Sequence, residues 1–261
     1  MDLGLNGLVA VVTGGTSGIG LATTELLLAE GASVAICSRN AARVEAQVQR
    51  LGERCFGMAA DVCDKEAVAR FRDGVVGRFG SVDILVHSAG ESRMANFEST
   101  DEAAWREELD LKFFGFINPT RAFLPDLRSS RNASIVYVSA LLAIQPETRL
   151  VATSATRAGV LNLAKSLSFE LAPAGIRVNT LLLGVIESGQ WVRRWQAERE
   201  GGSDIDRATF MQNLARDRAV PLGRIGTAEE VARSIAFLAS PASSYTTGAM
   251  LELSGGLSRR V

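Results

Sequence analysis

Three glycines near the start of the chain stand at a spacing that could hold phosphate groups. The apolar run 8–13 predicts a strand, and Gly14, Gly18 and Gly20 follow it where a helix opens. Gly14 permits a tight turn, Gly18 leaves room for the backbone to approach a phosphate, and Gly20 lets the helix pack closely on its strand. The first amides of the helix then face the anion. With these flanks, the segment favours a dinucleotide pyrophosphate site over a structural glycine turn.

Short apolar strands alternate with helical segments along the rest of the chain. The expected strands are residues 8–13, 34–37, 54–60, 84–87, 135–138 and 177–182. The expected helices are residues 19–29, 64–79, 101–128, 150–171 and 227–238. Pro119 and Pro125 should kink or end the third of these helices. The alternation predicts an α/β fold, a single-domain Rossmann-type doubly wound parallel sheet that spans residues 1–261.

The composition limits what the protein can bind. The 261 residues are 47% hydrophobic, which is enough to bury one large core. The net charge of -1 and the pI near 6.0 give no general attraction to nucleic acid or to an anionic membrane. The apolar stretch 180–186 is too short to cross a bilayer, and the start lacks the basic region of a signal peptide.

The cysteines bear on the compartment and on metal binding. Cys37, Cys55 and Cys63 are odd in number and lack the spacing of metal or redox motifs. We therefore expect buried thiols in a reducing cytoplasm and no metal site.

One long charged segment interrupts the alternation. Residues 190–219 lie between the sixth expected strand and the last expected helix, and Gly201 and Gly202 break the segment. Loops of this length are usually lids or disordered, and we expect a lid-like cover. Trp191 and Trp195, one helical turn apart, could cover a substrate or could equally be core anchors.

Five further motifs accompany the glycine turn: Asp61-Val62, His87-Ser88-Ala89-Gly90, Gly175-Ile176-Arg177-Val178-Asn179, Tyr245-Thr246-Thr247-Gly248 and Gly255-Gly256. With them the chain resembles the classical short-chain dehydrogenase/reductases over nearly its whole length. The resemblance implies an oxidoreductase that holds a nicotinamide dinucleotide at the glycine turn. It also implies a homo-oligomer, because the family commonly forms dimers and tetramers through the helices that match 101–128 and 150–171.

The resemblance assigns roles to two of these motifs. Asp61 matches the aspartate that touches adenine, and residues 87–90 match an Asn-Asn-Ala-Gly turn that supports the central strand. His87 and Ser88 replace both asparagines here. His87 is the only histidine and could be catalytic, but a residue at a strand end beside the cofactor is more often structural.

The end of the second strand bears on the choice of cofactor. NAD enzymes usually place an acid there for the ribose hydroxyls, whereas this chain has Ser38, Arg39 and Asn40. A guanidinium can hold a 2′-phosphate through paired hydrogen bonds, so we expect NADP, although Arg39 could also be a solvated arginine. The expected cofactor-binding residues are Gly14, Thr16, Ser17, Gly18, Ile19, Gly20, Ser38, Arg39, Asp61, Val62, Ala89, Gly90, Arg157, Gly184, Ile186 and Ser188.

The chain departs from the family at the catalytic tetrad of Asn, Ser, Tyr and Lys. Alignment with the family pattern puts Lys112 at the asparagine, Thr153 at the tyrosine and Arg157 at the lysine. The serine position falls on Ala140, with Ser139 beside it. The candidate catalytic residues are therefore Thr153, Arg157, Ser139 and Lys112.

These replacements change the available chemistry. An aliphatic hydroxyl is a much weaker acid than a phenol, so Thr153 is a poor proton donor. Arg157 cannot exchange protons near neutrality, but it could still grip ribose hydroxyls. Neither Tyr137 nor Tyr245 matches the catalytic register. Hydride transfer is weakened without being excluded, because general acid catalysis supplies roughly 10²- to 10⁴-fold while orientation supplies about 7 to 11 kcal/mol.

Charged residues stand where the family receives its substrate. Glu91 and Arg93 follow the fourth strand, and Glu147 and Arg149 follow the fifth. Lys112 would join them if its helix turns it inward. Each can be a solvated surface charge, whereas together they suggest a polar or charged small-molecule substrate.

Three functions remain open from the sequence. The leading one is an NADP(H)-dependent oxidoreductase that acts on a carbonyl or alcohol through a substituted proton-transfer system. The second is a non-redox lyase or isomerase that keeps the nucleotide or reuses its site. The third is a catalytically silent dinucleotide-binding protein.

Overall fold

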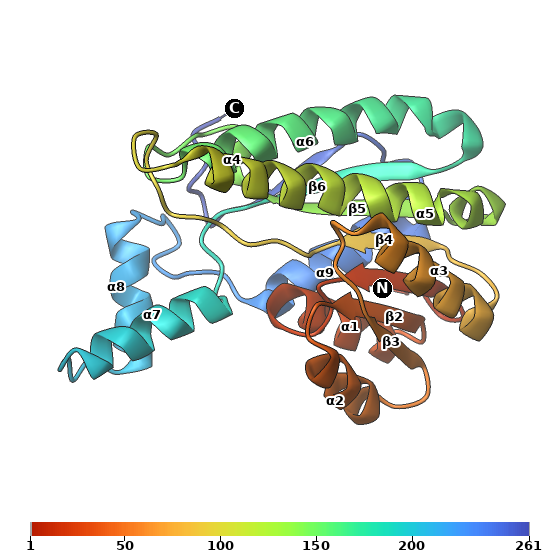
Figure 1. The fold of residues 1–261 in the computed structure, drawn as a ribbon, viewed down its shortest axis with the longest axis horizontal. Coiled ribbons are helices and arrows are strands. Elements are labelled where there is room, and N and C mark those ends of the chain that lie inside the picture. Colours follow the sequence, from red (N-terminus) through yellow and green to blue (C-terminus); the bar gives the residue numbers. More distant parts are fainter. Residues whose placement is uncertain (1, 261) are drawn as a thin grey trace.

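A parallel sheet of seven strands forms the centre of the computed structural model, which describes residues 2–260 (Figure 1). The strands are β1 (Val9–Thr13), β2 (Ser33–Ser38), β3 (Cys55–Ala59), β4 (Ile84–His87), β5 (Ser134–Ala140), β6 (Arg177–Leu183) and β7 (Met250–Leu253). Their order is β3-β2-β1-β4-β5-β6-β7, and every neighbouring pair is parallel. The chain winds outward from β1 in one direction and from β4 in the other. The predicted doubly wound Rossmann-type sheet is confirmed, and its switch point lies at the carboxyl ends of β1 and β4.

Helices cover both faces of this sheet (Figure 1). They are α1 (Gly18–Ala29), α2 (Ala41–Leu51), α3 (Lys65–Phe79), α4 (Glu102–Leu109), α5 (Gly115–Ser129), α6 (Val151–Glu170), α7 (Gly189–Glu200), α8 (Arg207–Asp217) and α9 (Ala228–Ala239). Helices α1, α2 and α9 pack on one face, and α3, α5 and α6 pack on the other. Among residues 2–260, no helix combines the length and the apolarity that crossing a membrane requires.

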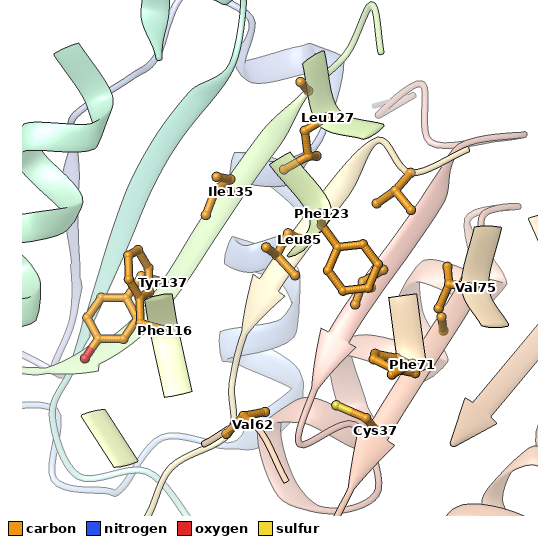
Figure 2. Packing of buried hydrophobic residues seen from close by; sticks show 14 of the residues in the cluster. Cys37, Val62, Phe71, Val75, Leu85, Phe116, Phe123, Leu127, Ile135 and Tyr137 are labelled. Atoms are coloured by element: carbon orange, nitrogen blue, oxygen red, sulfur yellow. The ribbon is translucent and has the colours of Figure 1, made fainter. Parts of the chain in front are cut away.

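Aromatic side chains fill the core between the sheet and helices α3, α5 and α6 (Figure 2). Phe71 and Phe123 meet edge to face, with their ring centroids 5.9 Å apart. Phe116 of α5 packs in the same way on Tyr137 of β5, at 5.2 Å. The central strands are apolar on both faces because both faces are covered. This packing anchors α5 and α6, which flank the carboxyl end of β5.

The predicted strands hold within one or two residues, except that β7 was not predicted. Strand β7 lies at the edge of the sheet, and its residues Met250, Leu251 and Glu252 are exposed. Its sequence therefore carries neither the buried apolar run nor the alternation that indicates a strand.

The expected long helix 101–128 is interrupted, but not at its prolines. A wide π-helical turn at Asp110–Phe114 separates α4 from α5, and both Pro119 and Pro125 lie inside α5. Pro119 has no N–H to donate to the carbonyl of Gly115, the first residue of α5. The expectation that the prolines end the helix was wrong, because α5 runs through both of them with Phe116, Pro119 and Phe123 buried in the core.

Residues 190–219 form helices rather than an irregular loop. Helices α7 and α8 project from the body of the molecule at one end (Figure 1). Trp191 and Val192 of α7 pack with Met211 and Ala215 of α8 in a small separate core. Trp195 donates from its indole nitrogen to the carbonyl of Ile205, 3.0 Å away. The segment thus has its own packing, which its charge-rich sequence obscured.

Candidate active site

A cleft of about 1290 Å³ opens at the carboxyl ends of β1, β4, β5 and β6. Ligands of doubly wound sheets bind at this edge, outside the switch point. All the residues expected to hold the dinucleotide line this cleft: Gly14, Thr16, Ser17, Gly18, Ile19, Gly20, Ser38, Arg39, Asp61, Val62, Ala89, Gly90, Arg157, Gly184, Ile186 and Ser188. The structure therefore brings together segments from six separate parts of the chain.

The glycine turn before the N-terminus of α1 has a backbone that can bind an anion. Gly14 has a φ of +71°, and a Cβ there would lie 2.9 Å from the Cα of Ala89. Gly18 has a φ of +53°, and a Cβ there would meet nothing within 4 Å, so the backbone is open on that side. Ser17 caps α1 without a side-chain hydrogen bond, which leaves the first N–H groups of the helix for a ligand. The turn fits a pyrophosphate.

Buried polar atoms without a partner gather on the walls of the same cleft. Within the described part of the chain these atoms are Ser38 Oγ, His87 Nδ1, Tyr137 Oη, Ser139 Oγ and Arg157 Nε, and all five residues line the cleft. Buried polar side-chain atoms in proteins nearly always have a hydrogen-bond partner. Their concentration here fits a site whose ligand is rich in hydroxyl and carbonyl groups, as a dinucleotide is.

A buried group of three polar side chains stands beside these atoms. The ammonium of Lys112 lies 3.3 Å from a carboxylate oxygen of Glu108 and donates to the carbonyl of Glu91, 2.6 Å away. The hydroxyl of Thr153 donates to the same carboxylate oxygen at 2.8 Å and accepts from the backbone N–H of Arg93 at 3.2 Å. The side chains of Lys112 and Glu108 are only 3% and 6% exposed. Lys112 is held inward because it lies in the π-helical turn, one helical turn after Glu108.

The surroundings of Lys112 bring its ionisation close to neutrality. Burial, helped by the positive charge of Arg157 and opposed by Glu108, lowers the pKa of Lys112 to about 8. The side chain of Lys112 can therefore exchange protons with a ligand in this cleft near physiological pH.

His87 does not share this property. Burial lowers the pKa of His87 to about 3, so the ring is neutral over the physiological range. Its Nε2 lies 3.0 Å from the hydroxyl of Thr120, and the ring packs on Phe116 at 4.4 Å between centroids. These contacts give His87 a packing role that joins β4 to α5.

Comparison with known proteins identifies the family. A family model described as enoyl-(acyl carrier protein) reductase matches residues 14–258. The 3-oxoacyl-[acyl-carrier-protein] reductase of Thermotoga maritima is 34% identical over 256 residues, which cover 97% of this chain and 98% of that protein. The chain is a member of the short-chain dehydrogenase/reductase family. The predicted resemblance is confirmed.

Two solved structures are similar over the full fold. An NADPH-bound short-chain oxidoreductase from Pseudomonas aeruginosa PAO1, described as containing an atypical catalytic center, is 50% identical with a TM-score of 0.92 and covers 97% of this chain and 98% of that one. The L-sorbose reductase of Gluconobacter frateurii, solved with NADPH and L-sorbose, is 28% identical with a TM-score of 0.94 over the whole of both chains.

The four candidate catalytic residues of this family member do not all reach the cleft. Lys112, Ser139 and Arg157 line it, and Ala140 lies beside them. Thr153 is fully buried and is not among the lining residues. Its place in the tyrosine register therefore does not give it the tyrosine's access to a ligand.

The sequence interpretation missed two residues of the site. Glu108 stands four residues before Lys112, a spacing that predicts an ion pair on a helix, but its contact with Thr153 requires the packing of α4 on α6. Tyr137 was set aside because it is out of register, yet its hydroxyl is buried without a partner on the cleft wall. Tyr245, the other tyrosine, is fully exposed and lies outside the cleft lining.

The charged residues expected near the substrate divide into two groups. Glu91 and Glu147 line the cleft, whereas Arg93 and Arg149 do not. Arg93 forms an ion pair with Glu107.

Helix α7 contributes to the cleft wall as well. Trp191 anchors the small core of α7 and α8 and also lines the cleft, while its role in covering a substrate stays a prediction. Trp195 is absent from the lining and serves as a packing residue.

Proposed function

We propose that this chain is an NADPH-dependent reductase of a carbonyl compound, in which Lys112 replaces the family's phenol as proton donor. The observation that carries the proposal is the buried ammonium of Lys112, whose pKa is lowered to about 8 on the wall of the cleft that holds the glycine turn. General acids work best when their pKa lies near the operating pH. No other side chain with a lowered pKa near neutrality lines the cleft within residues 2–260.

The preference for NADPH is supported by Arg39. It lines the cleft at the end of β2, and it forms no ion pair with a described carboxylate. A free guanidinium there can hold a 2′-phosphate. Both NADPH-bound relatives support the same choice.

The residues of the chain take separate roles in this proposal. Bound NADPH supplies the hydride. Arg157, with its unpartnered Nε, donates to ribose hydroxyls, and the hydroxyls of Ser139 and Tyr137 orient the carbonyl oxygen of the substrate. Two of the three N–H groups of Lys112 are directed to Glu91 and Glu108, which leaves one to protonate that oxygen.

Glu108 and Thr153 act as positioning residues. The carboxylate of Glu108 favours the charged form of Lys112, and Thr153 holds that carboxylate in place. Because burial and Arg157 disfavour the same charge, the ammonium is a stronger acid than an ordinary lysine.

The assembly and location of the protein belong to the same proposal. Large apolar side chains are exposed on α4 to α6, at Leu109, Phe114 and Phe169, and on the edge strand β7, at Met250 and Leu251. Such surfaces fit a homo-oligomer. The cysteines are all free thiols, which fits a reducing compartment such as the cytoplasm.

Turnover with a panel of aldehydes and ketones tests the function. Loss of NADPH absorbance in step with alcohol formation supports the reductase. Product formation without NADPH oxidation would select a lyase or isomerase, and NADPH binding without any product would select a silent binding protein. We expect slow turnover of simple neutral ketones, because a phenol in the tetrad register is missing.

A further inference from the structure

Arginines gather at the end of the cleft that α7 and α8 cover. Arg193, Arg194 and Arg218 line the cleft, and the charge of Arg149 reaches Arg194 as well. Glu147 neutralises one of them through a 2.8 Å ion pair with Arg218. Arg193 and Arg194 of α7 have no ion-pair partner among the described residues.

Arg194 is the least satisfied member of this cluster. It is half-buried and lies within ion-pair distance of none of the carboxylates that the structure describes. Its guanidinium stacks on the ring of Trp191, 4.6 Å from the centroid, and contacts the sulfur of Met94. Burial lowers the pKa of Arg194, and the charges of Arg218 and Arg149 lower it further.

A purely structural role does not account for this arrangement. Stacking on an aromatic ring satisfies the face of the guanidinium but none of its N–H groups, and a thioether is a weak acceptor. Five N–H donors therefore stand beside an open cleft with little to donate to. The Trp191 ring fixes the plane of the fork, which is the preorganisation that paired binding of an oxyanion requires.

We infer that Arg194 and Arg218 form an anion subsite and that the substrate is a carbonyl compound bearing a carboxylate. This inference rests on the proposed reductase function and names its substrate class. The geometry favours a carboxylate over a phosphate monoester. Arg218 is already paired with Glu147, so the single guanidinium fork held on Trp191 matches the two oxygens of one carboxylate.

Pairs of ketones that differ only in charge test the inference. The probes are levulinate with methyl levulinate, acetoacetate with methyl acetoacetate, and dihydroxyacetone phosphate with dihydroxyacetone. The variant is Arg194→Gln, and the matched control is Arg199→Gln on the same helix, because Arg199 stacks on Trp195 at 5.5 Å but does not line the cleft. We measure kcat/KM with NADPH, and the binding of levulinate to the NADP-loaded protein by calorimetry.

The parent protein should prefer at least one keto acid to its ester by about 10-fold or more. Arg194→Gln removes the charge-assisted hydrogen bonds to the carboxylate. It should therefore lower kcat/KM for the acid about 10- to 100-fold more than kcat/KM for the ester. Arg199→Gln should match the parent. Equal use of acid and ester, or equal losses on both, would overturn the subsite while leaving the reductase intact.

Two further outcomes separate the proposals. Preference for the phosphate ester, lost in Arg194→Gln, would overturn the carboxylate assignment. Suppose that none of the ketones is reduced. If levulinate then binds to the parent and binds more weakly to Arg194→Gln, the subsite stands and the reductase is rejected. If levulinate does not bind in this way, the subsite is rejected.

Discussion

The hydroxyl of Thr153 donates a 2.8 Å hydrogen bond to the buried carboxylate of Glu108. The residue that occupies the tyrosine register of the family thus serves a carboxylate behind the cleft wall. That carboxylate is the ion-pair partner of Lys112, so Thr153 can affect the reaction only through the charge state and position of the lysine.

Replacing Thr153 should change the pH dependence more than the rate. Thr153→Val removes a hydrogen bond from buried Glu108, so we expect a loss of stability of about 1–3 kcal/mol. Glu108 then supports the charged form of Lys112 less well, and the pKa of Lys112 should fall below the parent's value of about 8. The measurement is the pH profile of kcat/KM for reduction, whose upper limb should move to lower pH.

The matched control is Thr156→Val. Thr156 is also buried on α6, but its hydroxyl bonds the helix carbonyl of Ala152 at 2.9 Å. The Thr156→Val variant should destabilise the protein without moving the upper limb of the pH profile. A Thr153→Val variant that abolishes turnover while it stays folded would give the hydroxyl a direct role.

Arg39→Asp should reverse the cofactor preference. The parent should bind NADPH more tightly than NADH, because Arg39 can pair with the 2′-phosphate that NADH lacks. An acid at this position repels that phosphate and can accept from ribose hydroxyls. Titration of both cofactors into the parent, Arg39→Asp and the control Arg70→Asp measures the effect, since Arg70 is exposed on α3 outside the cleft. Equal affinity of the parent for both cofactors would contradict the assignment.

His87→Asn should make the stability less sensitive to acid. Unfolded His87 takes up a proton near pH 6.5, whereas burial holds the pKa in the folded protein at about 3. Between these values the unfolded state binds more protons, so the folded state loses stability as the pH falls. The free energy of unfolding in urea, measured from pH 6.5 downward, should decline less steeply in the variant. An unchanged slope would show that other groups cause the acid sensitivity.

Hydrogen exchange can test whether residues 190–219 act as a mobile cover. We expect exchange in α7 and α8 to be faster than in α6 and to slow when NADPH and a keto acid bind, because Trp191, Arg194 and Arg218 line the cleft. Slow exchange that no ligand changes would make the segment a fixed structural element.

Local chemistry explains why much of the fold and the glycine turn could be predicted. The positive φ values of Gly14 and Gly18 and the apolar runs of β1 and β4 depend on residues that are adjacent in the sequence. The π-helical turn at Asp110–Phe114 could not be read in the same way. It depends on tertiary contacts, in which the buried side chain of Lys112 reaches the carbonyl of Glu91.

The catalytic wall could be predicted only in part, for a related reason. Alignment placed Lys112 and Arg157 correctly on the cleft, because their positions follow from the register of two helices. The contact between Thr153 and Glu108 joins residues 45 positions apart, and no local pattern encodes it. Tyr137 lies outside the catalytic register, as predicted, and its place on the cleft wall follows from the fold rather than from a motif.

The pH profile of reduction tests the central claim most directly. Lys112 must be protonated to act as the acid, so kcat/KM of the parent should be constant below pH about 8 and fall above it. The variant is Lys112→Met combined with Glu108→Gln, which removes both charges and leaves no unpaired buried carboxylate. We expect this double variant to lose roughly 10²- to 10⁴-fold in kcat/KM. The fall of kcat/KM above pH about 8 should disappear, while NADPH should still bind. A folded double variant that keeps the parent's rate and the parent's limb would contradict the account and turn attention to the hydroxyl of Tyr137.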